Sequence, residues 1–99
     1  MESVIKKPQN IDKNIIHGFP FVREDVLLNE VDLKERLTKL TRALQLGNLH
    51  KQHVRLRFKH QNEEQYETLA TVWAVTEKYV VLKGGVTIPI HSIYEIELI

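Results

Sequence analysis

The sequence predicts a mainly β domain, in which one amphipathic helix precedes a small barrel of five strands. Three observations support this prediction. Leucines recur with helical spacing between residues 33 and 44, strand-like alternation runs from residue 53 almost to the C-terminus, and turn signals recur at short intervals. The 99 residues, 42% hydrophobic and 27% charged, are sufficient for one globular domain.

Residues 1–22 are predicted to be a flexible or docked N-terminal segment, and residues 23–99 to form the domain. Neither a helical nor a strand period is sustained in the segment, so residues 1–14 are expected to be mobile. Residues 15–22 are expected to be extended and to dock on the domain, because their two phenylalanines are unfavourable in water. The alternative is a disordered leader that carries both phenylalanines.

The helix is predicted to begin at Asp32, because an aspartate caps a helix N-terminus well and Glu35 follows three residues later. An earlier turn at residues 24–29 either extends the helix or precedes it. Gly47 is expected to end the helix as its C-terminal glycine. Such a short apolar stripe favours a helix that faces the core over a coiled-coil seam. The stripe consists of Leu33, Leu37, Leu40 and Leu44.

The remainder of the chain is predicted to form the strands of the barrel. Two alanines in the long second strand permit the sharp bend that closes a small barrel. Gly84 and Gly85 predict a tight hairpin turn, and Pro89 marks a sheet edge or a strand end because it has no N–H to donate. Trp73 is expected in the core of so small a barrel. The five strands are predicted at residues 53–60, 66–76, 79–83, 86–90 and 93–98.

Residues 78–82 combine a polar residue, an aromatic residue and an aliphatic run, and residues 90–93 place a histidine before a serine and an isoleucine. Together with the order of elements over residues 32–98, this pattern resembles the Sm-like superfamily, in particular the Hfq group of bacterial RNA chaperones. The resemblance implies a uridine pocket between neighbouring subunits of a ring. It further implies that Tyr79 stacks on a base and that His91 contacts it.

A second resemblance is based on the Val-x-Leu-x-Phe strand at residues 54–58, the Ile-Pro-x-x-x-Ile-x-x-Ile segment at residues 88–96 and the Ala43-Leu44 pair in the helix. These motifs are similar to those of the YolD-like family of small bacterial proteins, which have an SH3-like or Sm-like barrel. Residues 17–21 are similar to the aromatic N-terminal segment of that family. The resemblance implies an accessory module in a DNA-repair or translesion-polymerase context.

The basic face of the first strand is the main candidate site. Alternate strand residues share a face and lie about 7 Å apart, close to the spacing of phosphates along a single nucleic-acid strand. The alternatives are a solvated face whose cations pair with Glu63, Glu64 and Glu67 across the hairpin, or lysines that protect an edge strand from pairing with another chain. The basic residues of this candidate site are Lys51, His53, Arg55, Arg57 and Lys59. Stacking surfaces on the same side would come from Tyr66, Trp73, Tyr79 or Tyr94.

Other chemistry has little support in the sequence. The chain has no cysteine, so a reducing cytoplasm is the expected location, and the first residues lack the apolar core of a secretion signal. His50, His53 and His60 lack a shared strand face and nearby Cys or Asp, so we predict no metal site and no cofactor. Neither a nucleophile–base pair nor a glycine-rich phosphate loop is present, so we predict that the chain is not an enzyme.

The sequence therefore predicts a cytoplasmic, non-enzymatic binding module that contacts RNA or another single-stranded nucleic acid through the basic strand. The alternative is a protein-interaction module, in which the helix, residues 15–22 or the edge strand at residues 93–98 docks a partner protein. A homo-oligomer that forms through the edge strands is compatible with either function.

Overall fold

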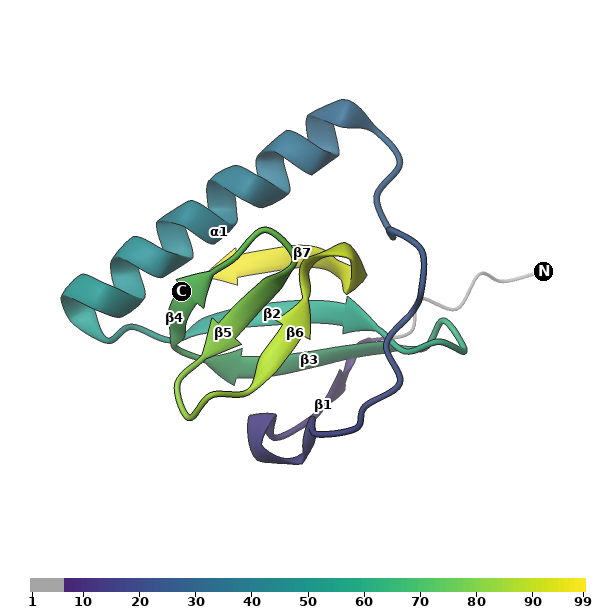
Figure 1. Cartoon of the computed structure of the whole chain (residues 1–99), viewed down its shortest axis with the longest axis horizontal. Helices are drawn as coiled ribbons and strands as arrows, with labels where there is room; N and C mark the ends of the chain where they lie inside the picture. Colours follow the sequence, from purple (N-terminus) through teal and green to yellow (C-terminus); the bar gives the residue numbers. More distant parts are fainter. Residues whose placement is uncertain (1–6) are drawn as a thin grey trace.

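Residues 7–99 have a mixed α/β fold of one α-helix and seven strands in two sheets (Figure 1). The structure, a computed structural model, describes residues 7–99. The first sheet has the order β1 (Gln9–Asn10), β3 (Gln65–Ala70), β2 (Val54–Lys59) and β7 (Ile93–Leu98). The second has the order β4 (Val72–Val75), β5 (Tyr79–Leu82) and β6 (Thr87–Pro89). The other elements are α1 (Glu30–His50), η1 (Lys13–Ile15) and η2 (Ile90–Ser92).

The long second strand of the prediction is two strands. Thr71 separates β3 from β4, and the chain passes there from the first sheet to the second. The change of direction follows Ala70, one of the two alanines at which a bend was expected. Within residues 7–99 the strand pairing gives two sheets and does not join them into one closed barrel.

Both sheets and the helix contribute to a single core. Val54, Leu56 and Phe58 of β2 are fully buried, as the alternation predicted, while the basic residues between them point outward. Val80 and Leu82 of β5 belong to the same apolar cluster. Because β2 is a central strand of its sheet, its outward residues lie between those of β3 and β7.

The helix is longer than predicted at both ends. It begins at Glu30, where the Asn29 side chain accepts a hydrogen bond of 2.7 Å from the Val31 N–H. It ends at His50, and Lys51 forms the left-handed cap with a φ of 52°. The prediction that Gly47 ends the helix is therefore wrong.

The helix packs closely against β4, which explains the glycine in its interior. A Cβ at Gly47 would overlap the carbonyl oxygen of Val72. The buried face of the helix differs from the predicted leucine stripe, since Leu37 is 59% exposed. Because Ala43 and Gly47 are small, the side of the helix that carries them can approach the sheet closely. This side, rather than the leucine stripe, therefore faces the sheet. The buried residues of α1 are Arg36, Leu40, Ala43 and Gly47.

The N-terminal segment is docked on the first sheet. β1 runs parallel to β3, and Ile16 is almost fully buried. The ring centroid of Phe19 lies 5.3 Å from that of Phe58 and 5.0 Å from that of Tyr66. The prediction of a mobile segment is wrong for residues 9–10, which form β1, and for residues 13–14, which belong to η1; residues 1–6 lie outside the described residues.

Across residues 7–99, α1 is too polar to span a lipid bilayer, and the short 3₁₀ helices are not candidates.

Candidate binding surfaces

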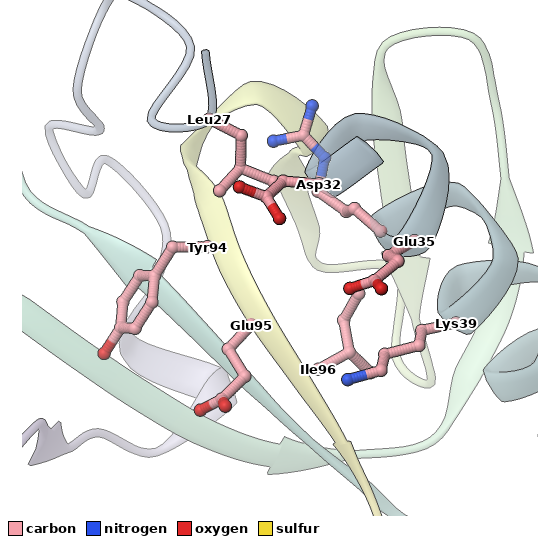
Figure 2. A pocket seen from close by; sticks show the side chains of 8 residues that line it. Leu27, Asp32, Glu35, Lys39, Tyr94, Glu95 and Ile96 are labelled. Atoms are coloured by element: carbon pink, nitrogen blue, oxygen red, sulfur yellow. The ribbon is translucent and has the colours of Figure 1, made fainter. Parts of the chain in front are cut away.

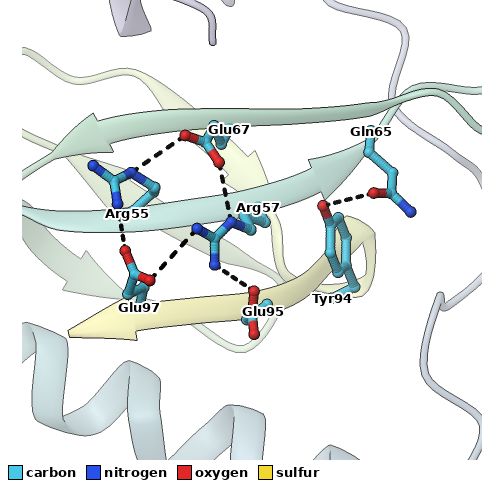
Figure 3. Close-up of polar contacts among 7 residues, drawn as sticks. All are labelled: Arg55, Arg57, Gln65, Glu67, Tyr94, Glu95 and Glu97. Carbon is cyan, nitrogen blue, oxygen red and sulfur yellow. Dashed lines mark hydrogen bonds and ion pairs between the residues drawn. The ribbon is translucent and has the colours of Figure 1, made fainter. Parts of the chain in front are cut away.

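The outer face of β2 carries an ion-pair network (Figure 3). Arg57 lies directly opposite Glu67 of β3 on one side and Glu95 of β7 on the other. Its Nε donates a hydrogen bond of 3.0 Å to Glu67, its Nη1 pairs with Glu95, and its Nη2 lies 3.5 Å from a carboxylate oxygen of Glu97. Opposite charges at facing positions stabilise neighbouring strands, so this arginine ties three strands together.

Arg55 belongs to the same network. Its Nη1 pairs with Glu97, and its Nε lies 3.3 Å from Glu67 without the geometry of a hydrogen bond. Two arginines therefore face three glutamates, and the formal charge of the network is 2 − 3 = −1. Of the three glutamates expected as partners from the sequence, only Glu67 takes part. The other two glutamates of the network, Glu95 and Glu97, lie on β7, which is distant from β2 along the chain.

Burial and hydrogen bonding act in opposite directions on Arg57. Burial lowers the pKa of this guanidinium, but its hydrogen bonds to Glu67 and Glu95 and the nearby charge of Glu97 outweigh burial, so the pKa is raised. The side chain of Arg57 is only 18% exposed. The arginine is thus held in its charged form and largely covered by its partners.

Tyr94 is the aromatic residue that shares the side of this network. The pairing register shifts between Phe58, which faces Ile93, and Arg57, which faces Glu95, so Tyr94 is an extra residue in β7. Its hydroxyl donates a hydrogen bond of 3.2 Å to Gln65 of β3 (Figure 3). Burial raises the pKa of Tyr94, and this effect outweighs the charge of Arg57, which lowers the pKa.

The other basic residues of the predicted site lie at the ends of β2. Lys51 is the exposed cap of α1, and His53 is exposed just before the strand. Lys59, opposite Gln65, is half-buried. Within residues 7–99, none of these three forms an ion pair. The predicted basic face is therefore divided into a paired centre and unpaired ends.

The structure brings Tyr79 and His91 together, although they lie on β5 and η2. Both line a pocket of about 310 Å³ to which Lys78 also contributes. Tyr79 is 45% exposed and faces Pro89 of β6. The ring Nε2 of His91 donates a hydrogen bond of 2.7 Å to the carbonyl of Val22. This bond links η2 to the segment that leads into α1. This pocket is separate from the outer face of β2.

A second pocket, of about 250 Å³, lies between α1 and β7 (Figure 2). Its polar lining is mixed in charge, with Glu35 and Lys39 from the helix and Glu95 from the strand. Arg36 also lines it, and this buried residue donates a hydrogen bond of 3.0 Å to the carbonyl of Ile93. Its position on the inner face of the helix was not recognised from the sequence, because the leucine spacing dominated the pattern.

The outer face of the second sheet contains an exposed tryptophan that sequence reasoning placed in the core. Trp73 is 50% exposed, so that prediction is wrong. Facing pairs place Ala74 beside Val81 and Val81 beside Thr87, and the exposure of Trp73 places it on this outer side. We name this surface the Trp73–Tyr79 face. It consists of Trp73, Ala74, Tyr79, Val81, Thr87 and Pro89.

No known protein family matches the chain, and no curated protein or solved structure is significantly similar to it. Over residues 7–99, no group of three or more histidine, aspartate or glutamate side chains is placed to hold a metal ion.

Proposed function

We propose that the chain is a cytoplasmic, non-enzymatic small-barrel module that binds single-stranded nucleic acid, with Tyr79 as a base-stacking residue. One observation carries this proposal: exposed Tyr79 shares a pocket with Lys78 and His91. An aromatic ring beside a lysine offers a base a stacking surface and a phosphate a cation. The one carboxylate in the lining of this pocket belongs to Glu77.

The barrel class is part of the same proposal. Only Thr71 separates β3 from β4, and its carbonyl accepts a hydrogen bond of 2.9 Å from the N–H of Lys83, just after β5. The last strand, β7, follows η2 and pairs with β2, the first strand after the helix. This order, around one shared core, supports the two sheets as halves of an SH3-like or Sm-like barrel. The Hfq-like and YolD-like resemblances agree with that assignment.

The ion-pair network gives β2 a structural role in this proposal. A phosphate near Arg55 or Arg57 would have to displace a carboxylate, and it would meet a network of net negative charge. Reversal of both arginines to glutamate would place five carboxylates on three neighbouring strands. Such a variant would therefore test folding rather than binding.

The test is a titration of a labelled short oligonucleotide, followed by fluorescence anisotropy, at about 50 and about 200 mM salt. We expect micromolar binding at the lower salt concentration and a large loss at the higher one, because counterion release drives phosphate contacts. Tyr79→Ala should weaken binding roughly tenfold, whereas Leu69→Ala, at an exposed apolar position on the first sheet, should not. Absence of binding at low salt would overturn the proposal.

A second candidate function is protein interaction, in the accessory role that the YolD-like resemblance implies. The observation that favours it is the apolar composition of the Trp73–Tyr79 face, since exposed aromatic and aliphatic patches are typical of protein interfaces. Residues 15–22, one of the docking segments considered from the sequence, are packed on their own chain through Ile16 and Phe19.

Self-association through edge strands remains compatible with either function. β7 and β6 each lie at one end of their sheet, with β1 and β4 at the opposite ends, so each has one edge without a neighbouring strand in residues 7–99. Light scattering on the purified chain tests this proposal: a mass above that of one chain supports it, and a strictly monomeric mass overturns it.

A further inference from the structure

A β-bulge places the single tryptophan of the chain in solvent. Val72 faces Leu82, but Ala74 faces Val81, so Trp73 is an extra residue in β4 without a facing partner. Val72 is fully buried, and Trp73 is half exposed. An indole is among the side chains that bury the most apolar area, so its burial would contribute strongly to the stability of the fold. Its exposure therefore points to a role outside the core.

Trp73 and Tyr79 form the two ends of an open platform. Between them the outer face carries Ala74 and Val81, which are small enough to leave both aromatic rings accessible. On the side of β6 the face continues with Thr87 and Pro89, opposite Val81 and Tyr79 respectively. No residue of this face is acidic. The platform is thus apolar and uncharged along its centre.

Lysines stand at both ends of this platform. Lys78 precedes β5 and Lys83 follows it, and the five residue steps across this four-residue strand place their Cα atoms about 16 Å apart. The Lys13 ammonium group donates a hydrogen bond of 2.8 Å to the carbonyl of Lys83, which brings a second cation to that end. Within residues 7–99 none of the three lysines forms an ion pair, and Glu77 is the one acid in the turn beside Lys78.

This arrangement fits a polyanion with exposed aromatic bases. Outward-pointing aromatic rings stack on bases, and lysines at the rim contact phosphates. A duplex conceals the faces of its bases within the stack, so such a platform selects an unpaired strand. The cations of β2 differ from these lysines, because Arg55 and Arg57 are paired with carboxylates and the lysines are not. The lysines can therefore bind a phosphate without first losing a partner.

Building on the nucleic-acid function proposed above, we infer that the Trp73–Tyr79 face is the binding platform for an unpaired nucleic-acid strand, with Trp73 as a second base-stacking residue and Lys83 and Lys13 as phosphate contacts. The strand lies along β5, with one base on Tyr79 and another on Trp73. A partner protein on the same face is the competing occupant.

The position of the single tryptophan allows a direct measurement, because all tryptophan fluorescence comes from Trp73. Addition of an oligo(dT) of about eight nucleotides should quench this emission as a base stacks on the indole, and salt should reverse the quenching. The same sequence annealed to its complement should quench far less. Quenching that is equal for the duplex would overturn the inference.

Separate variants test the base stacking and the phosphate contacts. Trp73→Ala should weaken oligo(dT) binding by roughly fivefold to a hundredfold, measured by anisotropy of labelled oligonucleotide, and Trp73→Phe should retain most of the affinity. Lys83→Gln and Lys13→Gln should each lower the slope of log affinity against log salt by about 0.7. Lys34→Gln, an exposed lysine of α1, is the matched control and should leave the slope unchanged.

The outcomes separate this inference from the function on which it rests. If the wild-type chain binds oligo(dT) and Tyr79→Ala weakens binding, but Trp73→Ala and Lys83→Gln do not, the platform is wrong and the function stands. If the wild-type chain does not bind at low salt, the nucleic-acid function and the binding platform are both overturned. The Trp73–Tyr79 face is then a candidate surface for a protein partner. Circular dichroism of Trp73→Ala establishes that the variant is folded. If it is unfolded, the Trp73→Phe and lysine variants decide the question.

Discussion

Arg36 and Asp25 form a two-point ion pair at the edge of the core: Nη1 lies 2.9 Å from Oδ1, and Nη2 lies 2.7 Å from Oδ2. The arginine side chain is 8% exposed and the aspartate 34%. The pair joins the segment before α1 to the inner face of the helix, and the third bond of Arg36, to Ile93, adds β7 to this junction. Such forked geometry is the strongest that an arginine offers to a carboxylate.

Asp25→Asn should therefore destabilise the fold by about 2–3 kcal/mol, because it leaves a buried guanidinium without its counter-charge. The free energy of unfolding is measured by urea denaturation. Asp12→Asn is a suitable control, since Asp12 is an exposed carboxylate that caps only η1. An equal loss in both variants would contradict a special role for the ion pair.

The ion pair between Arg36 and Asp25 makes the free energy of unfolding depend on pH in the acidic range. Burial raises the pKa of Asp25, but the hydrogen bonds from Arg36 and from the Leu27 N–H outweigh burial and hold the pKa below its ordinary value of 3.8. A carboxyl whose pKa is lowered by folding contributes stability above its unfolded pKa and loses this contribution as the pH falls through its folded pKa. The difference in unfolding free energy between the wild type and Asp25→Asn should thus be constant near neutral pH and shrink below about pH 4. A constant difference down to the acid transition would contradict this assignment.

Gly47→Ala distinguishes helix propensity from tertiary contact. In an exposed helix this substitution stabilises by about 1 kcal/mol. Here the added Cβ would overlap the carbonyl oxygen of Val72, which is backbone and cannot rotate away, so we expect destabilisation by about 1–3 kcal/mol. Asn48→Ala, at the next and exposed position, should be neutral or slightly stabilising in the same thermal or urea unfolding measurement.

The glutamates of β7 should mask the arginines of β2 from phosphates. Replacement of Glu95 and Glu97 together by glutamine leaves Arg55 and Arg57 with only Glu67. We expect oligonucleotide binding to tighten, and the slope of log affinity against log salt to steepen by about 0.7 for each arginine that gains a phosphate. Glu24→Gln with Glu63→Gln makes the same change in net charge at exposed positions elsewhere. If both double variants respond alike, general charge rather than unmasking is responsible.

Local patterns in the sequence predicted the elements that depend on neighbours in the chain. The alternation around Val54, Leu56 and Phe58 identified β2 and its buried side, because a period of two is visible without knowledge of the partner strands. The Gly84-Gly85 turn was expected for the same reason; both residues have positive φ values, of 97° and 88°.

Errors arose where a distant contact decides the outcome. Gly47 has the usual signature of a helix end, and only the approach of Val72 explains a glycine within the helix. Trp73 was expected in the core because the barrel is small, and the bulge that exposes it leaves no trace in the alternation of apolar residues. The partners of Arg55 and Arg57 could be predicted only in part, since the pairing of β2 with β7 depends on a register that no local pattern contains.

The docked N-terminal segment has a consequence for the time course of folding. Gln9 pairs with Tyr66, and Lys13 bonds to the carbonyl of Lys83, 70 positions further along the chain. Residues 9–13 therefore gain these partners only after residues as distant along the chain as Lys83 have been synthesised. Because long loops must close before these contacts form, folding should be slow for a chain of this length and should finish with the docking of this segment.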